Sequence, residues 1–401
     1  MKKKDILFIH QNFPGQFRHV AAYLVKQSEY QVKALGQEQA PGLPDIELAR
    51  YRVKRGPMPG THHYIRPMEQ AVLTGQAVAE ILIQLKRQGF NPTVVIAHPG
   101  WGESLFVKEV FPTCKLVHYC EWYYRADGAD VGFDPDHRVT LDDRARIRAK
   151  NAHQLLALDL CDIGIAPTQW QKSQFPEAYH HKIQVIHEGI DTDLAKPDLN
   201  ACFTLSNGQV LTRNNSVITY VARNLEPYRG FPQFMHALEL AQKQHATIEA
   251  LIIGGDGVSY GRKPSDAANW REHMSRKVKL DPARTHFLGK LPYHQYLKAL
   301  QISRAHVYLT YPFVLSWSLL EAIACGAPII ASDTAPVREF INDGENGTLV
   351  GFFKTDDIAT AMTRQASASN SPYSKPVPAA KSNTIQWIMA LGINVNAVTL
   401  K

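Results

Sequence analysis

One acidic residue stands inside an apolar helical pattern in the second half of the chain. A strand-like run over 306–310 is followed by a helical pattern over 318–325, in which Glu321 is surrounded by apolar residues. An ionised glutamate is rarely buried without a partner. The free N–H groups of a helix start, beside the carboxyl end of a parallel strand, favour anions. We therefore predict that Glu321 accepts hydrogen bonds from a sugar diol next to a phosphate site; a solvated or capping glutamate is the alternative.

Two arginines follow the strand predicted over 217–222. Arg223 lies at the carboxyl end of that strand, and Arg229 follows six residues later at the start of a predicted helix. Two guanidinium groups beside a helix amino end can hold a diphosphate, and each charge-assisted hydrogen bond of this kind contributes roughly 1.5–3 kcal/mol. The alternative is a pair of surface arginines that cap a turn.

Histidine and carboxylate side chains follow two strand candidates in the first half. The segment IAHPGWGES places His98 after the strand 94–97, and KLVHYCEWYY places His118 and Glu121 at the end of the strand 116–119. Histidine changes its charge near neutral pH, so such residues are candidates for ligand binding or proton transfer. A buried histidine with its hydrogen bonds satisfied inside the core is the alternative.

The segments around Glu321 resemble a known enzyme family. LEAIACGAPIIASD and PVREFINDGENGTLV, which together lie within 320–350, are similar to the second half of the signature of retaining glycosyltransferases of the GT-B type, family 4 (group 1). The resemblance implies an α/β GT-B fold, with two Rossmann-like doubly wound domains facing an interdomain cleft. It also implies that Glu321 holds the ribose of a nucleotide sugar, and that Arg223 and Arg229 stand where the family has an Arg and Lys pair.

The chain departs from the family pattern at one position of this signature. The first of the family's two glutamates, which lies against the donor sugar, falls at Phe313. Phenylalanine cannot replace a carboxylate, so the resemblance leaves the N–H groups of Val314, Leu315 and Ser316 to contact the donor sugar.

The resemblance extends to other loops that follow strands. It implies that Gly15 approaches the donor phosphate, although the usual second glycine of that loop is replaced by Gln16. Further contacts that it implies are His118 or Glu121 near the transferred sugar, Gly255 beside the nucleotide, and Leu288 and Lys290 at the base.

Alternating strands and helices must position these residues. Strand candidates and amphipathic helical stretches alternate in both halves, which is typical of parallel sheets covered by helices. The predicted strands are 6–9, 94–97, 116–119, 163–166, 183–186, 217–222, 250–253, 285–288 and 306–310, and the predicted helices are 77–88, 142–160, 231–242, 270–278, 293–302 and 318–325. The domains predicted from this pattern are 1–196 on the acceptor side and 216–364 on the nucleotide-sugar side, with a linker or hairpin over 197–215. The tail over 365–401 does not follow the family pattern, in which helices return to the first domain.

Composition narrows the class of protein. The chain has 401 residues and a net charge of +7, which favours two domains and acidic ligands such as nucleotide diphosphates or an anionic membrane face. No basic stripe with interleaved aromatic residues indicates nucleic acid binding, and the five cysteines have no zinc-like spacing. No signal-peptide core or membrane-spanning run is present, so we expect a cytoplasmic protein with at most a peripheral membrane contact.

The sequence therefore predicts a retaining, metal-independent hexosyltransferase without a cofactor. Its donor is a nucleotide diphosphate sugar, with UDP or GDP as the nucleotide, and the pathway expected is polysaccharide biosynthesis. The acceptor is a polysaccharide, a glycolipid or a small molecule. A nucleotide-sugar epimerase of the same fold and a non-catalytic nucleotide-sugar-binding protein are the alternatives. The sequence does not indicate the oligomeric state.

Overall fold

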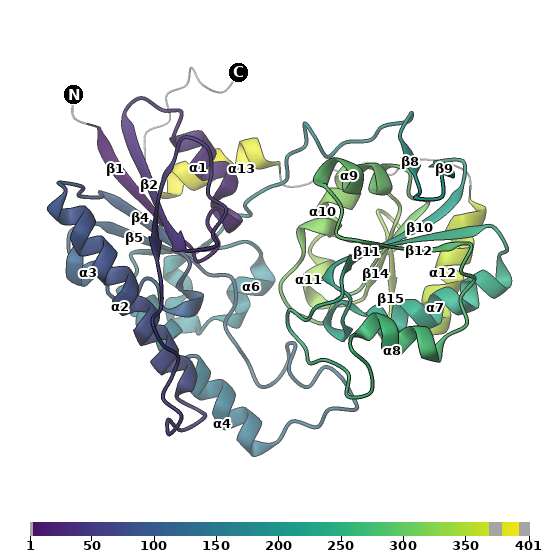
Figure 1. Cartoon of the computed structure of the whole chain (residues 1–401), viewed down its shortest axis with the longest axis horizontal. Helices are drawn as coiled ribbons and strands as arrows, with labels where there is room; N and C mark the ends of the chain where they lie inside the picture. The colour runs from purple at the N-terminus through teal and green to yellow at the C-terminus, as the bar shows by residue number, and fades with distance from the viewer. Residues whose placement is uncertain (1–2, 369–378, 393–401) are drawn as a thin grey trace. The chain divides into compact units, whose positions relative to one another are not determined.

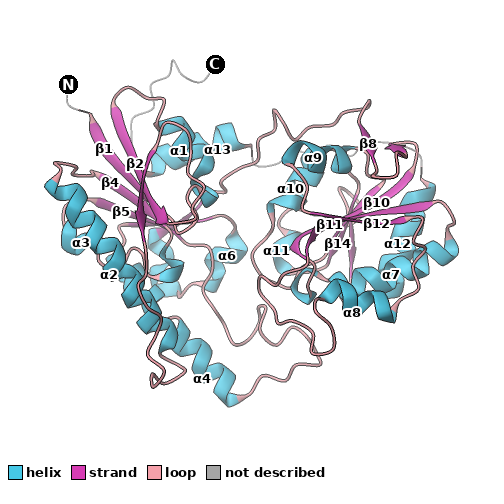
Figure 2. Cartoon of the chain, in the orientation of Figure 1, coloured by secondary structure: helices cyan, strands magenta, loops and turns pink. Residues whose placement is uncertain are grey.

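The computed structural model describes residues 3–368 and 379–392 of the chain (Figures 1 and 2). The chain divides into two compact units: the first ends at Gly189 and takes in a helix from the C-terminal region, and the second begins at Ile190. The sequence placed this boundary at residue 196. The predicted linker over 197–215 carries a hairpin of the second unit, in which β8 (Cys202–Thr204) pairs antiparallel with β9 (Val210–Thr212).

The first unit is built on a seven-stranded parallel sheet with the order β3-β2-β1-β4-β5-β6-β7. Its strands are β1 (Lys4–Ile9), β2 (Tyr30–Gln37), β3 (Glu47–Tyr51), β4 (Val94–Ala97), β5 (Lys115–Tyr119), β6 (Ile163–Ala166) and β7 (Ile183–Val185). Its α-helices are α1 (Arg18–Leu24), α2 (Arg66–Arg87), α3 (Val107–Val110), α4 (Leu141–Lys150), α5 (Ala152–Leu160), α6 (Gln169–Gln174) and α13 (Ala380–Ala390), and three short 3-10 helices lie at Gly15–Phe17, Pro99–Trp101 and Glu177–Lys182.

Alternate residues of β1 divide the core of the first unit between the two faces of the sheet. Ile6 and Phe8 pack with α1 and α13, whereas Leu7 and Ile9 pack with α2 and α3. Residues of a strand point alternately to opposite faces, so a central strand covered by helices on both sides is apolar throughout. This explains why the run from Ile6 to Ile9 is recognisable in the sequence.

The helix α13 returns to the first unit, where it packs beside α1 (Figure 1). The Trp387 side chain is buried between Phe17 and Tyr119, with ring centroids 6.2 and 6.0 Å away. The prediction that the tail departs from the family's return to the first domain is therefore wrong for 380–390. The apolar residues of this segment have no clear period in the sequence, but they complete a core that is otherwise formed by distant residues. The predicted tail also includes 369–378 and 393–401, which lie outside the described residues.

The second unit is built on a six-stranded parallel sheet with the order β12-β11-β10-β13-β14-β15. Its strands are β10 (Ser216–Asn224), β11 (Ile248–Gly255), β12 (Thr285–Gly289), β13 (Ala305–Tyr308), β14 (Ile329–Ser332) and β15 (Thr348–Val350). Its α-helices are α7 (Phe231–Gln244), α8 (Trp270–Lys277), α9 (Tyr293–Gln301), α10 (Trp317–Ala324), α11 (Ala335–Arg338) and α12 (Thr355–Ser367), and a 3-10 helix lies at Pro227–Arg229. Buried residues of α9, α10 and the β8–β9 hairpin pack on one face of the sheet, while α7 and α12 pack together beside β10.

Most predicted elements are confirmed within a few residues, but three differences bear on the first unit. The helix predicted over 77–88 is α2, which begins earlier, at Arg66. The strands β2 and β3 were not predicted. The single helix predicted over 142–160 is two helices, α4 and α5, which meet at Asn151. The Asn151 side chain accepts a hydrogen bond from the N–H of Tyr124 and donates one to its carbonyl oxygen, at 3.1 and 2.8 Å. A contact with a residue so far away along the chain leaves no local signal for the break.

Candidate functional site

Most of the candidate residues lie in or after the carboxyl ends of parallel strands in the two units. In the first sheet β1 lies between β2 and β4, and in the second sheet β10 lies between β11 and β13. The strand order reverses at these points, and open parallel sheets bind ligands outside the carboxyl ends of strands where this happens. Each unit is described separately below.

The two arginines of the second unit occupy different environments. Arg223 is exposed near the end of β10, where none of the described residues forms a hydrogen bond or ion pair with its side chain. Arg229 is buried, and its Nη1 donates hydrogen bonds to Thr310 Oγ1 at 2.8 Å and to the Val314 carbonyl oxygen at 3.0 Å. The structure therefore engages Arg229 with the loop after β13, a contact that the sequence did not predict, and leaves Arg223 accessible.

The short 3-10 helix that carries Arg229 lies directly against β13. Gly230 ends it with a φ of +66°, and a Cβ at this position would come within 2.4 Å of the Leu309 side chain. Because glycine alone combines this conformation with so close an approach, the sequence Arg-Gly fixes where the guanidinium enters the unit.

The loop after β13 is closed by aromatic packing where the family has a glutamate. Phe313 is buried, and its ring packs edge-on against Tyr260 and Tyr228, with centroids 5.0 and 5.7 Å away. The Ser316 N–H donates a hydrogen bond to Tyr308 Oη at 2.8 Å. Of the N–H groups predicted to face the donor sugar, that of Ser316 is thus already used inside the protein. Leu315 is buried in the core, and Val314 is half-buried, with its carbonyl oxygen bound to Arg229.

Glu321 lies on α10 with both carboxylate oxygens occupied by tyrosines of α9. Tyr293 Oη donates to Oε1 at 2.9 Å, and Tyr296 Oη donates to Oε2 at 2.7 Å. Burial raises the pKa of Glu321, and these two hydrogen bonds only partly oppose that rise. The carboxylate thus has two partners inside the protein, which the sequence analysis missed, and its hydrogen bonding to a sugar diol stays a prediction. The signal available was the spacing of Tyr293 and Tyr296, which places both hydroxyls on one face of a helix.

Three other predicted residues gather at the ends of β11 and β12. A Cβ at Gly255 would come within 2.7 Å of Asn224 Oδ1 and 2.9 Å of Lys290 Cε, so these side chains pass directly over the glycine. Lys290 is exposed after β12, and Leu288 is half-buried against the core. The structure thus brings Gly255 and Lys290 together.

A buried glutamate supports this edge of the second unit and was not predicted. Glu226 accepts hydrogen bonds from the N–H groups of Ser259, Tyr260 and Gly261 at 3.0 to 3.2 Å. The carboxylate fixes the loop that brings Tyr260 to Phe313. It also holds the Tyr260 ring beside Arg229, whose Cζ lies 5.4 Å from the ring centroid.

In the first unit, Glu121 receives hydrogen bonds from the side chains of Gln16 and His98. Gln16 Nε2 donates to Oε1 at 2.7 Å, and His98 Nε2 lies 3.2 Å from Oε2. Burial would raise the pKa of Glu121, but these hydrogen bonds contribute to a net lowering, so the carboxylate is ionised near neutral pH. The three residues follow β1, β4 and β5, which are neighbours in the sheet.

Gly15 lies against the ring of His10 beside this network. Its φ is +47°, and a Cβ would come within 2.6 Å of His10 Nε2. His10 Nε2 lies 2.9 Å from Gln16 Oε1. The sequence did not select His10, and Gln16 was taken only as a departure from the family's second glycine.

His118 does not join this group. Its side chain is fully buried in β5, and burial lowers the pKa of its imidazole to about 3. His118 is thus buried, as the alternative held, but neither of its ring nitrogens has a hydrogen-bond partner among the described residues, so it is not a satisfied core histidine. Of the two residues considered for this position, it is Glu121 that reaches the edge of the sheet.

A second carboxyl group lies deeper in the first unit. Glu103 is fully buried, and Tyr51 Oη donates a hydrogen bond to its Oε1 at 3.1 Å. Burial raises the pKa of Glu103 to about 7. It is therefore protonated in a large fraction of molecules at neutral pH, unlike Glu121.

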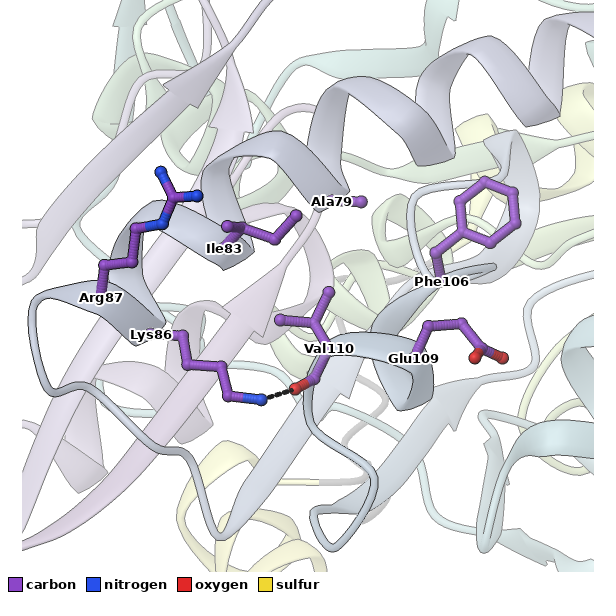
Figure 3. A pocket seen from close by; sticks show the side chains of 7 residues that line it. All are labelled: Ala79, Ile83, Lys86, Arg87, Phe106, Glu109 and Val110. Atoms are coloured by element: carbon purple, nitrogen blue, oxygen red, sulfur yellow. Dashed lines mark hydrogen bonds between the residues drawn. The ribbon is translucent and has the colours of Figure 1, made fainter.

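A hollow of about 680 Å³ lies away from these residues, between α2 and α3 of the first unit (Figure 3). Its lining includes Ile83, Arg87 and Phe106, and Lys86 Nζ donates a hydrogen bond to the Val110 carbonyl oxygen at 2.6 Å across one side. It is formed by helices that cover the sheet, and none of the predicted site residues lines it.

The family of the chain follows from two matches that cover both units. Residues 28–195 match the family model described as glycosyl transferase family 4 group, and residues 206–376 match that described as glycosyl transferases group 1. The chain belongs to the family 4, group 1, glycosyltransferases. This confirms the resemblance proposed from Glu321 and the segments that follow it.

Curated relatives are distant. D-inositol 3-phosphate glycosyltransferase of Rhodococcus jostii is 24% identical over 184 residues, which are 45% of this chain and 39% of that protein. Alpha-maltose-1-phosphate synthase of Mycolicibacterium smegmatis is 24% identical over 286 residues, which are 65% of this chain and 70% of that protein. The chain spans about half the length of most curated relatives that it matches, including the first two, at 39% and 53%.

Solved structures confirm the GT-B fold over nearly the whole chain. Sucrose-phosphate synthase of Thermosynechococcus elongatus has a TM-score of 0.66 at 16% identity and covers 96% of this chain and 98% of its own. The Anabaena protein HepE, in complex with UDP-glucose, has a TM-score of 0.61 at 16% identity and covers 97% and 99%. Among residues 3–368 and 379–392, every helix is too short or too polar to cross a membrane.

Proposed function

We propose that this glycosyltransferase moves a hexose-type sugar from a nucleotide diphosphate sugar to an acceptor with retention at the anomeric carbon and without a metal ion. The observation that carries the proposal is the environment of Arg223. It is an exposed guanidinium with no partner among the described residues of its own unit, at the switch point of a family 4 nucleotide-sugar fold. Such a group suits an anionic ligand.

The residues of the second unit have distinct roles in this proposal. Arg223 binds the diphosphate directly, and Arg229 supports the diphosphate site indirectly by holding the loop at Val314. Lys290 and Leu288 contact the nucleobase, Gly255 lies beside the nucleotide, and Glu321 binds the ribose. In the transfer step, the acceptor oxygen bonds to the anomeric carbon while the bond to the diphosphate oxygen breaks, and the acceptor proton leaves with the diphosphate. The cation stabilises the charge that develops on the leaving group.

The test separates binding from folding. We expect Arg223→Ala to lower turnover by about 10²–10³ and to leave the melting temperature within a few degrees. Arg138→Ala is the matched control, because Arg138 is exposed in the first unit and its side chain has no hydrogen bond or ion pair with any described residue; this variant should change neither turnover nor melting temperature. Thermal-shift and calorimetric titrations with UDP, GDP and ADP sugars measure the affinity for each nucleotide sugar and so identify the donor. One relative is named as GDP-mannose-dependent and HepE is solved with UDP-glucose, so both bases belong in the panel. Unchanged activity of Arg223→Ala would contradict the proposal.

Phe313 favours a second candidate, a nucleotide-sugar-binding protein that does not transfer. The family carboxylate is replaced by an aromatic ring that is buried against Tyr260. Binding of a donor without transfer or hydrolysis, across the whole panel, would support this candidate. Turnover of a donor with no acceptor present would instead support the epimerase predicted as an alternative.

A further inference from the structure

The strongest unassigned arrangement is the hydrogen-bonded network that surrounds Glu121 in the first unit. The Asn12 N–H donates to His10 Nδ1 at 2.9 Å, so the proton of the neutral imidazole is on Nε2, which faces Gln16 Oε1. This fixes the Gln16 amide with its NH₂ toward Glu121. Burial lowers the pKa of His10 to about 3 and keeps this ring neutral.

The second donor to Glu121 is oriented in the same way. The Gly100 N–H donates to His98 Nδ1 at 3.1 Å, so Nε2 carries the proton that points at Glu121. Two backbone N–H groups thus set both tautomers, and every hydrogen bond in the network runs toward a single carboxylate. This network makes Glu121 a fixed acceptor.

Glu121 retains capacity for a ligand. A carboxylate has about four acceptor positions, and the network uses two of them. The side chain is 26% exposed, and no lysine or arginine among the described residues of its unit forms an ion pair with it. The remaining positions of this anion therefore face donors that come from outside the network.

An aromatic side chain lies against His98, one of the two donors to the carboxylate. Trp101 is 37% exposed, and one face of its indole stacks on His98 with centroids 4.4 Å apart and an interplanar angle of 24°. A sugar ring combines hydroxyl donors with apolar C–H faces, so it can donate to a carboxylate and cover an aromatic ring at the same time. An anionic group would be repelled by the uncompensated charge.

We propose that Glu121 and Trp101 form the acceptor subsite, and that the acceptor group bound there is a neutral sugar or polyol rather than a phosphorylated one. This inference rests on the proposed transferase function. Glu121 accepts a hydrogen bond from an acceptor hydroxyl, and Trp101 covers a face of its ring. His10, Gln16 and His98 are positioning residues that act through Glu121. The preference contrasts with the relative whose name specifies inositol 3-phosphate.

The experiment compares matched ligands on the full chain. Glucose, maltose and myo-inositol are titrated beside glucose 6-phosphate, maltose 1-phosphate and inositol 3-phosphate, with UDP and then GDP present, and binding is followed by saturation-transfer NMR. We expect at least one neutral compound to bind at least tenfold more tightly than its phosphate. Trp101→Ala should weaken that binding at least tenfold and leave the network intact.

Two glutamate variants distinguish the effect of removing a charge from the subsite from the effect of removing the same charge elsewhere on the chain. Glu121→Gln should weaken the neutral ligand about tenfold and reduce its advantage over the phosphate. Glu80→Gln, which removes the same charge from an exposed position on α2, should change neither. Glutamine at position 121 would point an amide donor at one of two fixed donors, so folding is checked by the melting temperature, and Trp101→Ala provides the independent test.

The outcomes are separable from those of the proposed function. Nucleotide binding and its loss in Arg223→Ala test the second unit alone. Tighter binding of the phosphates, no binding of any neutral compound, or unchanged binding by Trp101→Ala and Glu121→Gln would overturn the acceptor subsite even where nucleotide binding is intact.

Discussion

The switch points of the two sheets are equivalent in topology and opposite in charge. The first gathers an ionised carboxylate, Glu121, with neutral histidine and glutamine donors. The second exposes Arg223 and places Arg229 behind the loop that follows β13. Parallel strands decide where polar side chains collect, but the residues that follow each strand decide the charge of the ligand that the edge can bind. The comparison therefore predicts hydroxyl recognition in the first unit and anion recognition in the second.

We expect the largest effect on turnover from the two arginines of the second unit, and we expect their effects on stability to differ. Arg229→Ala removes the buried cation that holds the loop behind the ligand and leaves Thr310 and the Val314 carbonyl without their donor. We expect turnover to fall by about 10²–10³ and stability to fall by about 1.5–3 kcal/mol, because hydrogen bonds to charged groups are worth that much. Denaturant unfolding measures the second quantity, and Arg223→Ala is the control that should lose turnover alone. Equal unfolding midpoints for both variants would show that the Arg229 contacts contribute no stability.

Glu103 provides a pH test of the first unit. Its pKa of about 7 in the folded protein lies above the ordinary value of 4.5, so the folded state binds this proton more tightly than the unfolded state. The stabilisation is complete below about pH 4.5 and is lost as the pH rises through 7, by about 3 kcal/mol in total. The measurement is the difference in unfolding free energy between the wild type and Glu103→Gln from pH 4.5 to 8.

The same series distinguishes Glu103 from Glu121, whose pKa is lowered. A lowered pKa gives stability that is present at neutral pH and is lost only on acidification below the ordinary value. A difference curve for Glu103→Gln that is flat from pH 4.5 to 8 would show that water or a cation reaches this carboxyl.

The smallest effect concerns the tyrosines on Glu321. Tyr293 is 44% exposed and Tyr296 is 9% exposed, so a ribose would displace the first more readily. Tyr293→Phe removes a competing hydrogen bond, and we expect nucleotide affinity to rise about fivefold, which corresponds to about 1 kcal/mol. Tyr296→Phe should instead lower stability by a similar amount. Calorimetric titration with UDP and GDP measures the first effect, and weaker binding by Tyr293→Phe would mean that this hydroxyl contacts the nucleotide itself.

Elements and residues could be predicted from the sequence wherever the pattern that marks them lies within a few neighbouring residues. Buried strands such as Val94–Ala97 and Ile163–Ala166 are continuous apolar runs, and their bounds are confirmed. Glu321 was recognisable because one charge within an apolar helix needs a partner. The strands β2 and β3 mix polar with apolar residues and escaped prediction.

The remaining features depend on contacts between distant segments. In the sequence, Gln16 is recognisable only as a replacement of the family's second glycine. In the structure, its amide bridges His10 and Glu121. His118 and Glu121 are equally plausible from spacing, and only burial separates them. Phe313 reads as a lost carboxylate, whereas the structure shows a ring that packs with Tyr228 and Tyr260. Loop residues of this kind obtain their roles from partners that no local period can reveal.

The return of α13 to the first unit has a consequence for biosynthesis. Its Trp387 fills the space between Phe17 and Tyr119, yet the whole of the second unit is encoded before it. During translation the second unit can complete its own core, while the first must wait with an apolar face uncovered. A nonsense mutation late in the message would therefore damage the beginning of the protein, and chaperone demand should be concentrated on the amino-terminal half.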